Sequence, residues 1–355
     1  MEESSLRRYA QAAVVVTAVM AGGVCGGAQQ PQAGAAGTSQ VQEKPSGTSQ
    51  APASGATQVA PLQLRGLDGQ GASDPFPPVN PKNFTATTPT VDAVNAFLTQ
   101  LWGYDAKRVW RVAAIQTTQA PGVSHVTVLV ADKGSNAKVQ PTAFYVLPDG
   151  THAIAGDAVM SFGAKPFAAT RARLAAEADG PSRGAAGKEL ELVEFADMQC
   201  PHCKEAQSSM LQLEKDFPKA HIVYQNFPLA ALHPFATKAA IYGVCVTEQK
   251  PGAFWTYLQA VYDTQGGLTT EDGDKTLTAA VTKAGVDAAA VATCASGSEA
   301  QGKVLKSVQL AQQIGVDQTP TLAVNGRLVP VSPAAISYET LKGIVQFEAA
   351  QDGVR

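Results

Sequence analysis

The chemistry most specific to this sequence lies in four consecutive residues, Cys200-Pro201-His202-Cys203. Two cysteines separated by two residues can close into a small disulfide loop or open into a dithiol. An apolar segment at 191–195 precedes them and apolar residues at helical spacing follow them, so we expect the pair where a strand leads into a helix. Cys200 would then be the N-cap, and Pro201 suits the first helical position.

The start of a helix favours an anion, which predicts an ionised sulfur at Cys200. Unsatisfied N–H groups and the helix dipole lower the pKa of a thiol there, and His202 adds a donor or a positive charge close by. A stabilised thiolate means a stabilised reduced form, which makes the disulfide a stronger oxidant. We therefore expect Cys200 to be the nucleophile. Cys203, one turn into the helix and less exposed, would resolve the mixed disulfide.

Two other uses of a Cys-x-x-Cys pair have to be weighed. A zinc site needs two further ligands, usually a second such pair or two histidines, and the sequence has neither at a suitable spacing. We therefore expect no metal and no cofactor. A plain structural disulfide remains an alternative, although so tight a loop stores strain that makes it easy to reduce.

Length and charge narrow the class of protein. A chain of 355 residues is long enough for two folded units and some unstructured segment. Lysine and arginine number 27 against 30 acidic residues, the net charge is −3, and no basic block occurs, so we expect no nucleic-acid partner. After residue 25 no run of 18 apolar residues occurs, which excludes a polytopic membrane protein.

Residues 1–28 have the layout of a signal peptide. Two arginines precede an apolar stretch at 10–24, and small residues follow as far as Ala28. An uncleaved anchor helix and a lipid attached to Cys25 are the alternatives, and both would tether the protein to the membrane. All three interpretations place the folded part in the periplasm or another extracytoplasmic space, where disulfides persist.

The rest of the chain divides into four segments. Residues 29–82 are rich in Gln, Pro, Ala, Gly, Ser and Thr, which predicts a disordered linker. Residues 83–164 show one amphipathic helix and then alternating strands, which predicts a small α+β domain. Residues 165–188 read as a linker helix and loop. Residues 189–350 run strand, helix, strand, helices, hairpin, helix, which is an α/β order of thioredoxin-like type with a helical insertion.

Four blocks within about residues 190–345 resemble the DsbA-like thioredoxin family of extracytoplasmic thiol–disulfide oxidoreductases. They read VEFADMQCPHCKEA, NFPLAALHPFATKAAIYGVC, GAFWTYLQAVYDTQ and AQQIGVDQTPTLAVNGRLV. The resemblance implies that Pro320 is a cis proline whose loop lies against the disulfide and holds the substrate chain, with Thr319 tuning reactivity. Glu194 falls on the family's buried acidic position, where a raised pKa would suit proton relay. An exposed glutamate at a strand edge is the alternative.

The first folded segment is similar to the small dimerisation domain of the DsbC and DsbG disulfide isomerases. The similarity rests on APGVSHVTVLVADKG and AFYVLPDGTHAIAGDAV, and it implies a homodimer. The Cys-Pro-His-Cys sequence resembles the oxidases more than the isomerases, whereas Thr319 before Pro320 occurs in the isomerases and in many DsbA-like proteins. The direction of catalysis therefore stays open.

The remaining cysteines of the second segment, Cys245 and Cys294, lie in its helical part. In an oxidising compartment they are expected to form a structural disulfide, which would contribute on the order of 4 kcal/mol through loop entropy. Two buried free thiols that pack as small apolar residues are the alternative.

The sequence thus predicts an enzyme, an exported protein disulfide oxidoreductase that forms or isomerises disulfides in secreted proteins. The expected partners are unfolded or misfolded secreted proteins and a membrane redox partner that resets the cysteine pair. The alternative is a tethered chaperone or protein-binding module, in which the thioredoxin-like domain serves only as a scaffold.

Overall fold

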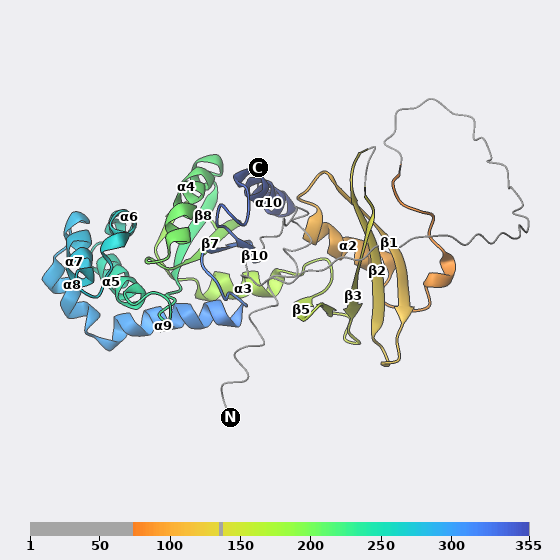
Figure 1. Cartoon of the computed structure of the whole chain (residues 1–355), viewed down its shortest axis with the longest axis horizontal. Helices are drawn as coiled ribbons and strands as arrows, with labels where there is room; N and C mark the ends of the chain where they lie inside the picture. The colour runs from red at the N-terminus through yellow and green to blue at the C-terminus, as the bar shows by residue number, and fades with distance from the viewer. Residues whose placement is uncertain (1–73, 135–137, 355) are drawn as a thin grey trace, which may run out of the picture.

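The computed structural model of the chain describes residues 74–134 and 138–354. The predicted signal peptide at 1–28, Cys25 and most of the predicted linker at 29–82 lie outside the described residues. Two folded units lie side by side along the long axis of the molecule (Figure 1). Within the described ranges, no helix combines the length and the apolar character needed to cross a membrane.

The N-terminal unit is a five-stranded antiparallel sheet with one helix, which confirms the predicted small α+β domain. Strands follow one another in chain order across the sheet. Thr90 caps the helix by accepting a hydrogen bond from the Ala93 N–H at 3.1 Å. The last strand, at 158–161, was not predicted. The elements are η1 (Pro81–Asn83), α2 (Val91–Trp102), β1 (Arg108–Thr117), β2 (Ser124–Asp132), β3 (Gln140–Val146), β4 (His152–Ala155) and β5 (Ala158–Ser161).

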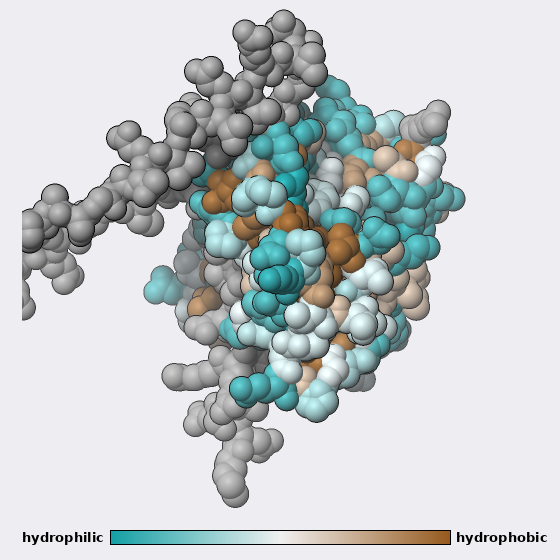
Figure 2. Space-filling view, turned by 90° about the vertical axis from the view of Figure 1, so that its right-hand side faces the viewer, coloured by the Kyte–Doolittle hydropathy of each residue, from teal (hydrophilic) through white to brown (hydrophobic). Residues whose placement is uncertain are grey.

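One face of this sheet packs on α2. Phe97 and Leu98 of the helix join Val126, Val128 and Phe144 of the strands in one apolar cluster. The alternation along β2 places these valines on the buried face, as a half-buried strand requires. Figure 2 views the molecule from this end, where hydrophobic side chains appear in small areas between hydrophilic ones. The unit therefore has a core of its own.

The second unit is built on a mixed five-stranded sheet in the order β10-β9-β7-β8-β6. The central strand β7 runs parallel to β8 and antiparallel to β9. Every residue of β7 is buried, its two glutamates included. The strands are β6 (Ser182–Gly184), β7 (Leu190–Ala196), β8 (Ala220–Asn226), β9 (Thr321–Val324) and β10 (Arg327–Pro330).

The loop expected within 165–188 differs from the structure. That segment does contain a helix, α3 (Ala168–Glu177), but residues 182–184 form β6 and pair antiparallel with β8. A three-residue strand of Ser, Arg and Gly carries no apolar alternation, so the sequence pattern gave no sign of it. The last part of the predicted linker thus belongs to the second sheet.

Helices cover both faces of this sheet and form a separate bundle at one end (Figure 1). Side chains of α4 and α10 pack on one face, and those of α3 and α9 pack on the other. The order of elements gives the predicted thioredoxin-like α/β fold with a helical insertion. The helices are α4 (Pro201–Asp216), α5 (Ala236–Gln249), η2 (Pro251–Ala253), α6 (Phe254–Asp263), η3 (Gln265–Gly267), α7 (Gly273–Lys283), α8 (Ala288–Ala295), α9 (Ser298–Gln313) and α10 (Tyr338–Gln351).

Candidate active site

The end of the central strand delivers the two cysteines to the start of α4. Cys200 is the N-cap of the helix and Pro201 occupies its first turn, as the sequence predicts. Cys203 follows within that turn. Both thiols are free and buried, with Cys200 5% exposed and Cys203 fully buried. The pair therefore lies where backbone N–H groups of the helix start point toward the first sulfur.

The pKa of Cys200 is lowered to about 5. The largest cause is the hydrogen bond from the Cys203 thiol, and burial opposes it. Smaller contributions come from the Thr319 side chain and from the backbone N–H groups of Cys203 and His202. From the sequence, the helix start is expected to be the main cause of this low pKa, whereas in the structure the Cys203 thiol lowers the pKa of Cys200 more than the backbone N–H groups do. Either way, Cys200 is a thiolate at neutral pH.

The pKa of Cys203 is shifted in the opposite direction from that of Cys200. Burial raises the pKa of this thiol well above its usual value, and the negative charge on Cys200 raises it further. The backbone N–H of Asp197 donates to its Sγ at 3.4 Å, which partly offsets these effects. The two sulfurs therefore differ sharply in protonation, one ionised and one kept as a thiol.

His202 lies on the outside of the pair. Its side chain is exposed, and its Nδ1 lies 3.1 Å from Oε2 of Glu205. That hydrogen bond is the main cause of the raised pKa of His202, and the charge on Cys200 adds to it. The raised pKa favours the charged imidazolium near the thiolate, and a carboxylate one turn along the helix holds the ring.

A cis peptide bond joins Thr319 to Pro320. Sγ of Cys200 lies 3.8 Å from the carbonyl oxygen of Thr319. Pro320 is buried and leads directly into β9, which pairs with the strand that carries the cysteines. The loop therefore lies against the first sulfur, at the position that the family resemblance implied.

Glu194 lies inside the sheet. It is 1% exposed on β7, directly between Tyr224 of β8 and Leu322 of β9. Its Oε1 accepts a hydrogen bond from Gln207 Nε2 at 2.8 Å, and its Oε2 has no hydrogen-bond partner among the described residues. Burial raises the pKa of this carboxyl to about 7. An exposed strand-edge glutamate does not fit this position.

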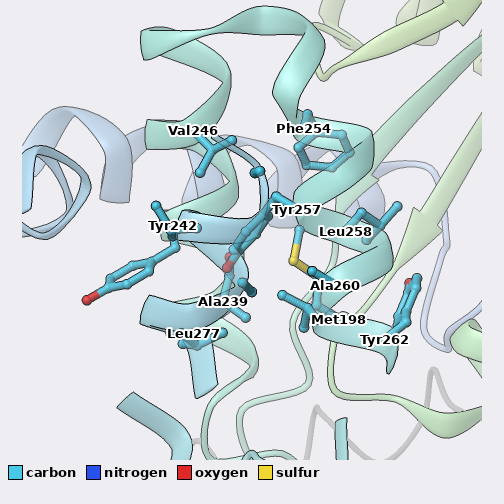
Figure 3. Close-up of a cluster of buried hydrophobic side chains, with 14 of the residues drawn as sticks. Met198, Ala239, Tyr242, Val246, Phe254, Tyr257, Leu258, Ala260, Tyr262 and Leu277 are labelled. Carbon is cyan, nitrogen blue, oxygen red and sulfur yellow. The ribbon is translucent and has the colours of Figure 1, made fainter. Parts of the chain in front are cut away.

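Sequence reasoning missed the side chains that hold the loop before the cysteines. Gln265 Nε2 donates to the carbonyls of Met198 at 3.0 Å and of Cys200 at 2.9 Å. Gln199 accepts from the Phe235 N–H at 2.7 Å. Met198 itself is buried in the core of the insertion, beside α6 (Figure 3). In the sequence, the only sign of this anchoring is that these residues fall within the four blocks that resemble the DsbA-like family.

The other two cysteines of the second unit join the helices of the insertion. Cys245 of α5 and Cys294 of α8 form a disulfide with Cα atoms 5.9 Å apart. Cys245 is fully buried, and both residues pack in the same apolar cluster as the tyrosines of α6. The same cluster extends to Ala196 of β7 and to Cys200 and Cys203.

A sheet whose central strand leads into a helix begun by Cys-x-x-Cys, with a cis-proline loop beside the first sulfur, defines a thioredoxin-type redox domain. Residues 178–346 match the protein family described as Thioredoxin. These residues form a thioredoxin-like domain of the DsbA-like kind, with a helical insertion.

Two curated relatives illustrate the similarity. The chain is 29% identical over 175 residues to Na(+)/H(+) antiporter NhaA 3 of Salinispora tropica, a match that covers 49% of this chain and 26% of that protein. It is 27% identical over 166 residues to the probable disulfide bond formation protein D of Bacillus anthracis, covering 45% of this chain and 73% of the relative. The chain thus spans about a quarter of the antiporter that it matches.

Two solved structures show some likeness to this chain. BdbD from Bacillus subtilis is 19% identical with a TM-score of 0.43, and the match covers 48% of this chain and 93% of that one. The thiol–disulfide exchange protein alpha-DsbA2 from Wolbachia pipientis is 21% identical with a TM-score of 0.43, covering 51% of this chain and 96% of that one.

Proposed function

We propose that the protein is an extracytoplasmic thiol–disulfide oxidoreductase that forms or isomerises disulfides in secreted proteins through Cys200 and Cys203. The observation that carries the proposal is the contrast between the two sulfurs. A pKa of about 5 keeps Cys200 ionised, while burial keeps Cys203 protonated. A dithiol with a stabilised thiolate makes its disulfide a ready oxidant.

In the oxidising direction, a substrate thiolate attacks Sγ of Cys200 in the Cys200–Cys203 disulfide. That bond breaks, its electron pair goes to Cys203, and a mixed disulfide forms. A second substrate thiolate then attacks the substrate sulfur, which forms the substrate disulfide and releases Cys200 as a thiolate. Counted from the substrate dithiol, two electrons and two protons leave the substrate. The electrons reduce the Cys200–Cys203 bond, Cys203 takes up one proton, and the other goes to solvent because Cys200 stays ionised.

In the isomerising direction the reduced protein acts first. The Cys200 thiolate attacks a substrate disulfide, and a mixed disulfide forms while the other substrate sulfur leaves as a thiolate. That thiolate can then attack a second substrate disulfide, whose other sulfur leaves as a thiolate, attacks the substrate sulfur of the mixed disulfide and releases Cys200. Alternatively, Cys203 attacks Cys200 and releases the substrate reduced. The same pair of sulfurs thus supports both directions.

The surrounding residues have defined parts in this scheme. Glu194, with a pKa of about 7, would give and accept the proton of Cys203 near neutral pH. Thr319 and Pro320 would present backbone to an extended substrate chain next to Cys200. Cys245 and Cys294 would serve structure rather than exchange. The partners would be unfolded or misfolded secreted proteins and a membrane redox partner, and the N-terminal unit would support a homodimer.

Replacing the first sulfur tests the proposal. The full chain and Cys200→Ser are compared in the reduction of insulin and in the oxidation of a reduced peptide. We expect Cys200→Ser to lose both activities to the uncatalysed rate, with Cys245→Ala/Cys294→Ala as a control that keeps Cys200. Equal rates for Cys200→Ser and the parent would refute the function. Unscrambling of misoxidised ribonuclease, together with the mass in solution, separates an isomerase from an oxidase.

A further inference from the structure

The peptide units of Asp197 contact both cysteines. Its N–H donates to Cys203 Sγ at 3.4 Å, and its carbonyl oxygen accepts from the Cys200 N–H at 3.1 Å. A small rotation of this backbone would weaken both contacts at once. Whatever fixes the conformation of Asp197 therefore also fixes the geometry of the dithiol.

The carboxylate of Asp197 is held by three donors from two segments. Its side chain is completely buried. Oδ1 accepts from the Gln199 N–H at 2.7 Å, and Oδ2 accepts from the Leu229 N–H and from His233 Nδ1, both at 2.8 Å. Because the acceptor is a carboxylate, Nδ1 of the imidazole carries the hydrogen. Leu229 and His233 belong to the segment between β8 and α5, about 35 residues along the chain.

His233 is the only one of these donors that a side-chain substitution can remove. The other two are backbone N–H groups. A buried carboxylate that loses a hydrogen-bond donor must find another partner or move. Movement would carry the Asp197 backbone away from Cys203, and a carboxylate with fewer donors would also oppose ionisation of the nearby sulfurs. Both effects disfavour the reduced, ionised pair.

We propose that His233 is a positioning residue, which acts through Asp197 to hold the Cys200–Cys203 pair in its reactive geometry. The imidazole fixes the carboxylate, the carboxylate fixes the backbone of residue 197, and that backbone contacts both cysteines. The inference rests on the proposed function, because it assigns Asp197 and His233 a role in tuning the Cys200–Cys203 dithiol. Asp197 and His233 themselves touch no substrate sulfur in the scheme above.

The fold around the loop is anchored independently of His233. Gln265 holds the carbonyls of Met198 and Cys200, and the Met198 side chain lies among the buried residues of α5 and α6 (Figure 3). His233 is partly exposed, with 19% of its side chain accessible. A conservative replacement of this histidine should therefore leave the unit folded while it removes one hydrogen bond.

Three variants of the full chain separate the hydrogen bond from the bulk of the ring. His233→Gln keeps the volume, but its amide lies beyond the position of Nδ1. His233→Asn places an amide N–H close to that position. His221→Gln is the matched control, because His221 is also a partly buried histidine whose Nδ1 contacts an acceptor, the Ala185 carbonyl, at 2.7 Å. That acceptor lies beside β6, and neither residue is in contact with the cysteines.

Two properties of the dithiol are measured, and neither is a turnover rate. The ultraviolet absorbance of the reduced protein against pH gives the midpoint of thiolate formation, and equilibration with glutathione gives the redox equilibrium constant. For His233→Gln we expect the midpoint to rise by about one pH unit and the equilibrium to move about tenfold toward the disulfide. His233→Asn should recover most of both shifts, and His221→Gln should match the parent.

The inference is wrong if folded His233→Gln leaves both properties at the parent's values, or if His233→Asn shifts them as far as His233→Gln does. Should His233→Gln not fold, His233→Ala removes the donor without adding bulk and takes its place in the same comparison. A parent protein without a thiolate at neutral pH would contradict the proposed function itself. If the parent has the thiolate and His233→Gln leaves both the thiolate midpoint and the redox equilibrium unchanged, only the role of His233 is contradicted.

Discussion

Arg327 Nε lies 2.7 Å from Glu348 Oε1, and both side chains are more than nine-tenths buried. The same guanidinium donates to the backbone carbonyls of Gln100 and Leu101, in the last turn of α2. A cation at the C-terminal end of a helix is favourable, because it satisfies carbonyls that have no partner within the helix. One arginine of the second unit thus ties the N-terminal unit to β10.

Removing Arg327 should allow the N-terminal unit and the second unit to unfold separately. Arg327→Met leaves Glu348 buried without its partner and leaves the end of α2 without a donor, which should cost about 3–5 kcal/mol. Denaturant unfolding followed by tryptophan fluorescence and by circular dichroism should give one coincident transition for the parent and two separate ones for the variant. Lys306→Met is the control, because Lys306 and Asp179 form an exposed pair and should change stability by less than about 0.5 kcal/mol. A single coincident transition in Arg327→Met would contradict the coupling.

The low pKa of Cys200 sets the pH at which the dithiol reacts. The folded pKa of about 5 lies below the usual value of 9.0, so the thiolate stabilises the reduced protein fully above pH 9 and progressively less as the pH falls toward 5. Alkylation of Cys200 by iodoacetamide should fall to half of its plateau rate near pH 5. Mass mapping identifies the labelled cysteine. A half-point near pH 8 to 9, as for an ordinary thiol, would contradict the assignment.

The sequence allowed the main elements to be predicted because their patterns are local. The apolar run at 191–195 gave the central strand, and Pro201 after Cys200 gave the helix start. The strands β5 and β6 were missed because their short sequences, Ala-Val-Met-Ser and Ser-Arg-Gly, show no sustained apolar alternation. Local patterns carry no information about the pairing of such short strands.

The residues that hold the site were harder to predict because they meet only in the folded chain. Asp197 and His233 are separated by 36 residues, and Arg327 and Glu348 lie on different elements. An arginine next to an Asn-Gly turn reads as an exposed residue, yet the contact with α2 buries it. Burial of a charged side chain is a consequence of tertiary packing, so a single sequence gives no direct sign of it.

The buried carboxyl of Glu194 should make stability depend on pH. Its folded pKa of about 7 lies above the usual value of 4.5, so folding favours the protonated form, and the cost of the charge grows as the pH rises from 4.5 through 7. Glu194→Gln should remove on the order of 2–3 kcal/mol of this cost at pH 8 and change little at pH 4. Denaturant unfolding at both pH values measures the difference. The exposed Glu205→Gln serves as the control, and an equal pH dependence in Glu194→Gln and the parent would exclude burial of the charge.

The disulfide between Cys245 and Cys294 should stabilise the fold without taking part in exchange. It closes a loop of 49 residues, and the loss of that constraint in Cys245→Ala/Cys294→Ala should lower the free energy of unfolding by about 4 kcal/mol. The thiolate titration of Cys200 should stay at the parent's midpoint, because neither Cys245 nor Cys294 is among the groups that shift the pKa of Cys200. Unfolding in denaturant and the ultraviolet titration are run on the same preparation. A shifted titration midpoint would show that the Cys245–Cys294 disulfide also influences Cys200. Unchanged stability would show that the disulfide does not stabilise the fold.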